Sequence, residues 1–355
     1  MRCSSGESRI VPSPRARGLP PSGSSRFRPP RHSRDAYAPA AVPFGSQRGG
    51  ALCHASSPSG RRGSGRVRFA TDHPYVLTAS CPSRMGTTAA ITGFLAARRF
   101  YLIEMHQFDD TISQRFFVRI TFCGVERESV ELAQVRQEFQ AIATREEMEW
   151  RIHDTRERTR VLIMVSNFDH CLEDLLYRHR TGELRMDITA VVSNHVTLQP
   201  TAARHNLPFF HLALTPANKP EQERRLLELI DSTRTELVVL ARYMQILSDD
   251  LCERLRGRAI NIHHSFLPGF KGAKPYHQAY DRGVKVIGAT AHYVSHDLDE
   301  GPIIEQIVER VDHTYTPEML VSAGRDSERR ALSAAVRYAI EHRVFLNGCR
   351  TVVFK

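Results

Sequence analysis

An asparagine and a histidine two residues apart lie at the end of an apolar run in the second half of this 355-residue chain. The run Ala259–Ile262 has the composition of a buried strand, and Pro268 and Gly269 then enforce a loop. Because side chains alternate along a strand, Asn261 and His263 point to the same face. An amide can donate to developing oxyanion charge, and an imidazole can move a proton. The pair therefore predicts chemistry on a carbonyl group at the carboxyl end of a strand.

A carboxylate further along the chain supplies a third candidate group. Asp299 lies in a turn immediately before Gly301 and Pro302. Histidines near strand ends are often hydrogen-bonded structural residues, so the Asn-x-His pair does not define a site by itself. His263, His264 and His277 do not have a zinc-ligand spacing, so we expect no metal and structural roles for the last two.

The wider sequence around these residues resembles a known family. The words Asn261-Ile262-His263, Ser265-Phe266-Leu267-Pro268, Gly272, and Asp299 before Gly301-Pro302 resemble the formyltransferases that use 10-formyltetrahydrofolate. The longer stretches HHSFLPGFKGAKPYHQAY and GATAHYVSHDLDEGPIIEQ are similar to the hydrolytic branch, the formyltetrahydrofolate deformylases. This resemblance covers about residues 72–355.

The resemblance implies an activity and a set of site residues. The activity is hydrolysis of 10-formyltetrahydrofolate to tetrahydrofolate and formate, which supplies formate for purine biosynthesis and balances the one-carbon folate pool. Water is the acceptor, and no cofactor is expected because the folate is the substrate. The implied catalytic residues are Asn261, His263 and Asp299. The implied substrate-binding residues are Tyr243, Met244, Gln245, Ile246 and Leu247 on one loop and Ser295, His296, Asp297 and Leu298 on another. Packing of these apolar residues on the sheet is the alternative explanation.

The second half of the chain has the pattern of an α/β fold. In residues 156–355, near-continuous apolar strands alternate with amphipathic helices, which predicts a doubly wound, mostly parallel sheet of the formyltransferase type. The runs 286–294 and 303–311 are expected to form later, antiparallel edge strands, and 318–342 a long helix. No glycine-rich phosphate loop follows the first strand, where Ser166-Asn167-Phe168 stands. Asn167 occupies a position where the resemblance leads us to expect lysine.

Residues 72–155 are predicted to form a separate unit with the ferredoxin-like order β-α-β-β-α-β. This unit resembles an ACT domain, a regulatory module that binds amino acids between copies, on the words Ser80-Cys81-Pro82 and His106-Gln107-Phe108. The turn that usually carries glycine reads Arg98-Arg99-Phe100-Tyr101 instead. An amino-acid effector and a purely dimerising scaffold therefore both remain open, and a homo-oligomer is expected.

The first 71 residues differ from the rest in composition. Residues 1–70 contain 13 Arg, no Lys and two acids, a net charge of +11, so the remainder carries about −1 of the total +10. This segment, rich in Arg, Ser, Pro and Gly, is expected to be disordered. A transit peptide, a basic binding arm and an incorrectly assigned start site each explain it. The near-neutral remainder predicts neither nucleic-acid nor membrane binding, and no apolar run has membrane length.

Two further functions remain as alternatives. One is formyl transfer from 10-formyltetrahydrofolate to an amine acceptor, and the other is an inactive regulator that binds folate or an amino acid. The missing phosphate loop counts against a phosphorylated acceptor. Seven scattered cysteines, without a Cys-x-x-Cys pair, indicate a reducing compartment. We expect the cytoplasm, or the mitochondrion if the leader is a transit peptide.

Overall fold

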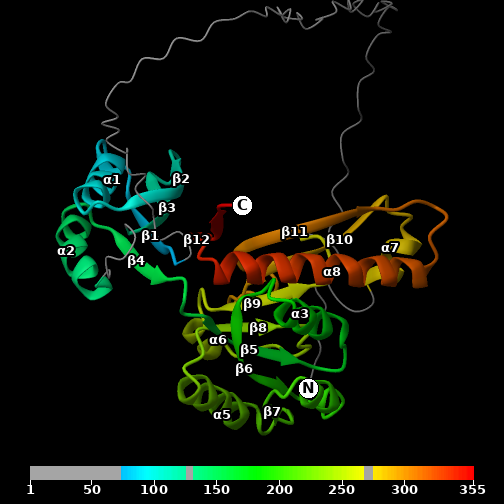
Figure 1. Cartoon of the computed structure of the whole chain (residues 1–355). Coiled ribbons are helices and arrows are strands. Elements are labelled where there is room, and N and C mark those ends of the chain that lie inside the picture. The colour runs from blue at the N-terminus through cyan, green and yellow to red at the C-terminus, as the bar shows by residue number, and fades with distance from the viewer. Residues whose placement is uncertain (1–72, 125–130, 268–274) are drawn as a thin grey trace, which may run out of the picture. The chain divides into compact units, whose positions relative to one another are not determined.

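The computed structural model describes residues 73–124, 131–267 and 275–355 (Figure 1). The expectations for the leader 1–71 lie outside these residues. The described part contains a four-stranded sheet, a seven-stranded sheet and a two-stranded hairpin.

The four-stranded sheet is built from the first described residues. Its strands are β1 (Tyr75–Pro82), β2 (Tyr101–Asp110), β3 (Arg115–Cys123) and β4 (Glu149–Asp154). They pair antiparallel in the order β2-β3-β1-β4, which is a ferredoxin-like order. Helices α1 (Thr87–Ala97) and α2 (Leu132–Arg145) bury Ile91, Leu95 and Phe139 with side chains of this sheet. The predicted element order is therefore observed here.

The seven-stranded sheet is mixed and mostly parallel, as predicted. Its strands are β5 (Thr159–Val165), β6 (Met186–Ser193), β7 (Phe209–His211), β8 (Leu237–Leu240), β9 (Ala259–His263), β10 (Val286–Tyr293) and β11 (Ile303–Arg310). The order is β11-β10-β9-β8-β5-β6-β7. Strands β5 to β9 pair parallel, whereas β10 pairs antiparallel with both β9 and β11.

Helices cover both faces of this sheet (Figure 1). They are α3 (His170–Arg180), α4 (Gln199–Arg204), α5 (Lys219–Ser232), α6 (Asp249–Arg254), α7 (Pro275–Asp281) and α8 (Pro317–Ile340). Alternation along β5 shows the two faces: Val161 and Ile163 join one core with α3 and α8, whereas Leu162 and Met164 join another with α5 and α6. Burial of both faces explains the continuous apolar strands.

The C-terminal hairpin was not predicted. Strands β12 (Val344–Asn347) and β13 (Arg350–Val353) pair antiparallel through a turn in which Gly348 has φ 64°. The Asn347-Gly348 dipeptide is a typical hairpin signal, so this element was identifiable from the sequence. Asn347 also donates to Asp110 at 2.7 Å, which ties the hairpin to the end of β2.

The strand order fixes where ligands approach the seven-stranded sheet. Within this sheet, β5 comes first along the chain. Strands β6 and β7 are then added on one side of it, and β8 and β9 on the other. Such a reversal opens a crevice at the carboxyl ends of the two central strands, here β5 and β8. The loops after β5, β8 and β9 therefore position the candidate site. Within the described residues, no helix has the length and hydropathy to cross a membrane.

Candidate active site

A cavity of about 270 Å³ lies at the carboxyl ends of β8 and β9. Asn261 and His263 enter it from β9, and Asp299 enters from the loop after β10. The structure thus brings together the three residues that the sequence singled out, although 36 positions separate His263 from Asp299. An amide, an imidazole and a carboxylate on one wall can bind a carbonyl oxygen and move a proton.

His263 and Asp299 form a close pair. The Nδ1 atom of His263 lies 3.1 Å from Oδ1 of Asp299, and Nε2 lies 2.8 Å from the hydroxyl oxygen of Ser265. Burial opposes ionisation of Asp299, but the hydrogen bond and charge of His263 outweigh it and lower the pKa of Asp299. Asp299 is therefore a carboxylate at neutral pH, and His263 is held at both ring nitrogens.

His292 orients the amide of Asn261. The two residues are opposite each other in the β9–β10 register, and Nδ2 of Asn261 lies 3.4 Å from Nε2 of His292. The other nitrogen of His292 donates to the carbonyl oxygen of Tyr293 at 2.9 Å. Burial lowers the pKa of His292, so the neutral ring presents a lone pair at Nε2. This lone pair fixes the amide nitrogen of Asn261 as the donor side.

The turn that carries Asp299 depends on a close approach of two backbones. Asp299 has φ 61°, a left-handed conformation that Asp tolerates better than most residues. At Gly301, a Cβ atom would lie 1.8 Å from the carbonyl oxygen of Tyr293 and 3.1 Å from Nδ1 of His292. Only glycine fits there without moving the strand that holds His292. The Gly301-Pro302 signal therefore has a steric cause.

The predicted folate loops line the rest of the cavity. Tyr243, Met244, Gln245, Ile246 and Leu247 after β8, and Ser295, His296 and Leu298 after β10, all contribute to its walls. The side chains of Met244, Ile246 and Leu298 remain exposed, although they are apolar. Exposed apolar side chains around a cavity suit a flat aromatic ligand better than packing on the sheet.

Asp297 lies outside the cavity, and two residues that were not predicted lie on its wall. Asp297 pairs with His296 at 3.0 Å, and its neighbouring hollow is separate from the cavity of Asn261. His292 and Arg242, which were not predicted as binding residues, also line the cavity. His292 contacts Asn261 because of the pairing register of β9 and β10, and the sequence alone does not reveal that register. Arg242 lies two residues after the end of β8, a position typical of ligand-facing residues.

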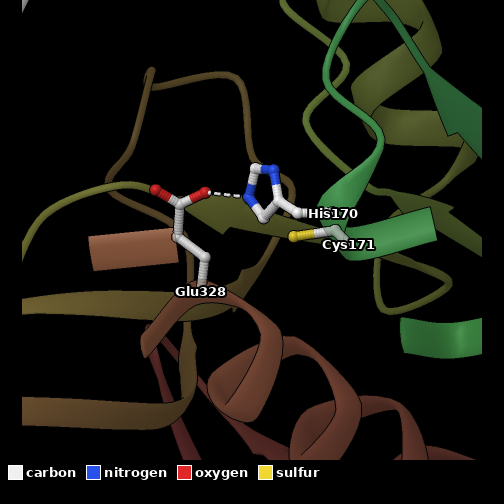
Figure 2. Close-up of side chains that lie close together, drawn as sticks. All are labelled: His170, Cys171 and Glu328. Atoms are coloured by element: carbon white, nitrogen blue, oxygen red, sulfur yellow. Dashed lines mark hydrogen bonds and ion pairs between the residues drawn. The ribbon is translucent and has the colours of Figure 1, made fainter. Parts of the chain in front are cut away.

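A second histidine–carboxylate pair lies beside the cavity, on the α3–α8 side (Figure 2). Nε2 of His170 donates to Oε2 of Glu328 at 2.7 Å, and the hydroxyl of Tyr276 donates to Oε1 at 3.0 Å. Nε of Arg242 lies 3.3 Å from the same carboxylate. Burial opposes the charge of Glu328, but the His170 hydrogen bond and Arg242 outweigh it and lower its pKa.

This cluster is the place in the described residues where three metal-ligating types meet, namely His170, Cys171 and Glu328. Their donor chemistry does not fit a cation. Both oxygens of Glu328 already accept hydrogen bonds, and Arg242 would repel a divalent ion. Burial and the charge of Glu328 raise the pKa of the Cys171 thiol, so a thiolate ligand is disfavoured.

Comparisons with known proteins match the fold and cover most of the chain. Residues 159–336 match the formyl transferase family model. A formyltetrahydrofolate deformylase from Corynebacterium sp. strain P-1 is 52% identical over 281 residues, covering 79% of this chain and 98% of that protein. The crystal structure of a formyltetrahydrofolate deformylase from Burkholderia mallei superposes with a TM-score of 0.77 at 56% identity, covering 80% of this chain and 100% of that one.

A more distant structure is glycinamide ribonucleotide transformylase 1 from Symbiobacterium toebii, with a TM-score of 0.53 and 29% identity over 57% of this chain and 97% of that one. The seven-stranded sheet and its site are therefore of the formyl transferase class. Within this class, the chain belongs to the formyltetrahydrofolate deformylase family.

Proposed function

We propose that this protein hydrolyses 10-formyltetrahydrofolate to tetrahydrofolate and formate. The observation that carries the proposal is the 3.1 Å pair between His263 and Asp299 on the wall of a cavity that also presents Asn261. This set can activate water and stabilise a tetrahedral intermediate. The relatives named formyltetrahydrofolate deformylase support the same substrate.

Asp299 is the group that activates water in this proposal. As a carboxylate, it accepts a proton from a water that attacks the formyl carbon, either directly or through the imidazole of His263. Ser265 holds the far side of that imidazole at 2.8 Å, so the ring keeps its orientation while a proton moves. His263 therefore positions Asp299 and shares the transferred proton.

Asn261 stabilises the oxyanion of the tetrahedral intermediate. Its amide nitrogen has two N–H groups, of which one faces His292 and the other is available to the formyl oxygen. Losing such a donor costs about 3 kcal/mol of barrier. As the intermediate collapses, the bond between carbon and N10 breaks, the proton goes from Asp299 or His263 to N10, and formate leaves.

The folate ring system is held between the two predicted loops. We assign binding roles to Tyr243, Met244, Gln245, Ile246 and Leu247 on one wall, and to Ser295, His296 and Leu298 on the other, with Asp297 beside them in the adjoining hollow. The exposed apolar side chains of Met244, Ile246 and Leu298 support this placement. No cofactor or metal is part of this proposal: water is the acceptor, Asp299 and His263 move the proton, and Asn261 donates to the oxyanion.

The four-stranded sheet is the regulatory half of the proposal. We assign residues 72–155 to an ACT-like domain, which the ferredoxin-like strand order supports. We also place the chain in a homo-oligomer. In the altered turn, Arg99 keeps φ 58°, a conformation that favours glycine, while the Phe100 ring packs 5.0 Å from that of Phe122. A core-packing aromatic ring in this turn favours a dimerising scaffold over an amino-acid effector site.

The cellular role follows from the products. Formate and tetrahydrofolate feed purine biosynthesis and the one-carbon pool, and we place the protein in the cytoplasm. If the leader is a transit peptide, we place the protein in the mitochondrion instead of the cytoplasm.

The test is formate release from 10-formyltetrahydrofolate by the full chain in buffer alone. We expect release without any amine. An N-formyl amine and tetrahydrofolate that form only when an amine is added, without formate, would make the protein a transferase, and folate binding without turnover would make it a regulator.

A further inference from the structure

The crevice between β5 and β8 is where this fold is expected to admit a ligand, because the strand order reverses there. In this chain the loops on its two sides are joined. The hydroxyl of Ser166, after β5, accepts from the backbone N–H of Met244, after β8, at 3.0 Å. The same hydroxyl donates to Asn194 at 2.7 Å, after β6. Polar groups that could meet a ligand are thus bonded to one another.

Five side chains, which we call the plug, occupy the α8 side of this crevice: Phe168, His170, Arg242, Tyr276 and Glu328. Glu328 is at the centre, with 2% of its side chain exposed, and it contacts His170, Tyr276 and Arg242. The guanidinium of Arg242 lies over the Phe168 ring at 5.1 Å. Segments after β5 and β8, α7 and α8 therefore converge on one carboxylate.

A glycine on α8 makes room for one residue of the plug. At Gly324, one turn before Glu328, a Cβ atom would lie 2.1 Å from the hydroxyl of Tyr276. The missing side chain lets the phenol reach the carboxylate. Figure 2 shows the opposite side, where His170 and Cys171 at the start of α3 face Glu328.

The plug also borders the catalytic groups. The ring of His264 lies 6.5 Å from that of Tyr276 and 4.9 Å from that of His263, measured between centroids. Burial, with help from Arg242, lowers the pKa of His264 to about 4, so this spacer is neutral. Arg242 and His264 line the same cavity as His263 and Asp299. Through Arg242, the plug therefore borders the cavity that contains His263 and Asp299.

Stability alone does not explain these charges. Nε and Nη1 of Arg242 are buried, and neither makes a hydrogen bond within the described residues. Apolar residues of the same volume would often be as stable as a buried ion pair, or more so. A cost of this kind is commonly associated with a functional requirement.

We propose that the plug excludes organic acceptors from the formyl group and so restricts the reaction to water. The inference rests on the proposed hydrolysis and names its specificity-determining residues. The same sheet supports a protein named for glycinamide ribonucleotide in the transformylase from Symbiobacterium toebii, so the fold itself does not exclude an amine. The difference must come from side chains such as these.

Opening the crevice should allow an amine to replace water. The amine nitrogen then attacks the formyl carbon, the bond between carbon and N10 breaks, and one proton passes from the amine to N10 through Asp299 or His263. The products are an N-formyl amine and tetrahydrofolate, and no oxidant or other reactant is needed.

The test compares products from the full chain and the double variant Arg242→Ala/Glu328→Ala, which removes both charges of the pair together. Each is incubated with 10-formyltetrahydrofolate and glycinamide, and formate and N-formylglycinamide are quantified by mass spectrometry. We expect the ratio of N-formylglycinamide to formate to rise by about tenfold or more in the variant. Phe168→Ala opens the outer, half-exposed edge without leaving a buried charge, and it decides the question if the double variant does not fold.

Two further variants separate the crevice from general damage. Arg254→Ala/Asp250→Ala removes an exposed pair with a 3.0 Å contact and should keep the wild-type ratio. Arg242→Lys retains a long cationic side chain, so the ratio of N-formylglycinamide to formate should also remain at the wild-type value. A folded, formate-releasing open variant that makes no N-formylglycinamide would overturn the proposal, as would a wild type that transfers equally well. Absence of formate from the wild type without glycinamide would instead refute the hydrolase.

Discussion

Two buried histidine–carboxylate pairs lie close together in this molecule and have different surroundings. His263 and Asp299 are 3.1 Å apart, and His170 and Glu328 are 2.7 Å apart. In both pairs, neighbouring positive groups outweigh burial and lower the pKa of the carboxylate. Residue type, distance and charge state therefore do not distinguish them.

Access distinguishes them. Asp299 stands on a loop at the cavity wall with 17% of its side chain exposed, whereas Glu328 stands on a helix with 2% exposed. Arg242 and Tyr276 occupy the remaining sides of Glu328. A pair open to a cavity can exchange protons with a substrate, whereas a sealed pair cannot and acts only through the side chains and segments that it holds in place.

Neutralising Asp299 should have the largest effect, and it should fall on turnover. Asn is the matched replacement because it keeps the shape and tolerates the left-handed backbone at φ 61°. Removing the base should lower kcat by about 10³-fold, within the range of general base catalysis. Formate release at saturating 10-formyltetrahydrofolate measures this loss.

Stability and binding provide the control for Asp299→Asn. The free energy of unfolding should change by less than about 1 kcal/mol, because this side chain is partly solvated. Folate affinity should remain close to that of the wild type. Near-normal turnover in this variant would show that the pair at the cavity is structural after all.

Neutralising Glu328 should have the opposite signature. Glu328→Gln keeps the volume but leaves the buried guanidinium of Arg242 without a counter-charge, which should lower the free energy of unfolding by about 3 kcal/mol. Formate release per folded molecule should fall much less than in Asp299→Asn. Urea denaturation and the turnover assay test the two halves of this expectation. A large loss of turnover in a stably folded variant would contradict the distinction drawn from access.

The sequence predicts one of these pairs and not the other, for a physical reason. Apolar strands predict the mixed sheet, and the Asn-x-His spacing and the turn before Gly301 are local words that carry the family resemblance from which Asn261, His263 and Asp299 were selected. His170 and Glu328 are 158 positions apart and meet because α3 packs on α8. Contacts that arise from helix packing have no short motif in the sequence. The β9–β10 register that places His292 beside Asn261 has none either.

A third histidine environment extends the comparison, because no carboxylate among the described residues is paired with it. The rings of His153, on β4, and His342, after α8, stack 3.5 Å apart. Burial is the main cause that lowers the pKa of His153 to about 3 and that of His342 to about 4, with Arg119 and Arg151 adding to it. Both rings are therefore neutral when folded, whereas they titrate near 6.5 when unfolded.

This pair should make folding sensitive to mild acid. Because the folded pKa values are depressed, the stabilisation is complete above pH 6.5 and is lost as pH falls toward 4. As the pH falls from 7 to 5, each ring should lower the free energy of unfolding by about 2 kcal/mol. His342→Gln removes one titrating ring, so its loss over this interval should be smaller than that of the wild type by about that amount. Urea denaturation at both pH values measures the difference, with turnover at pH 7 as the control for the distant cavity. Equal pH dependence in the two proteins would mean that the ring is charged when folded, and that a buried histidine here keeps its proton without a carboxylate.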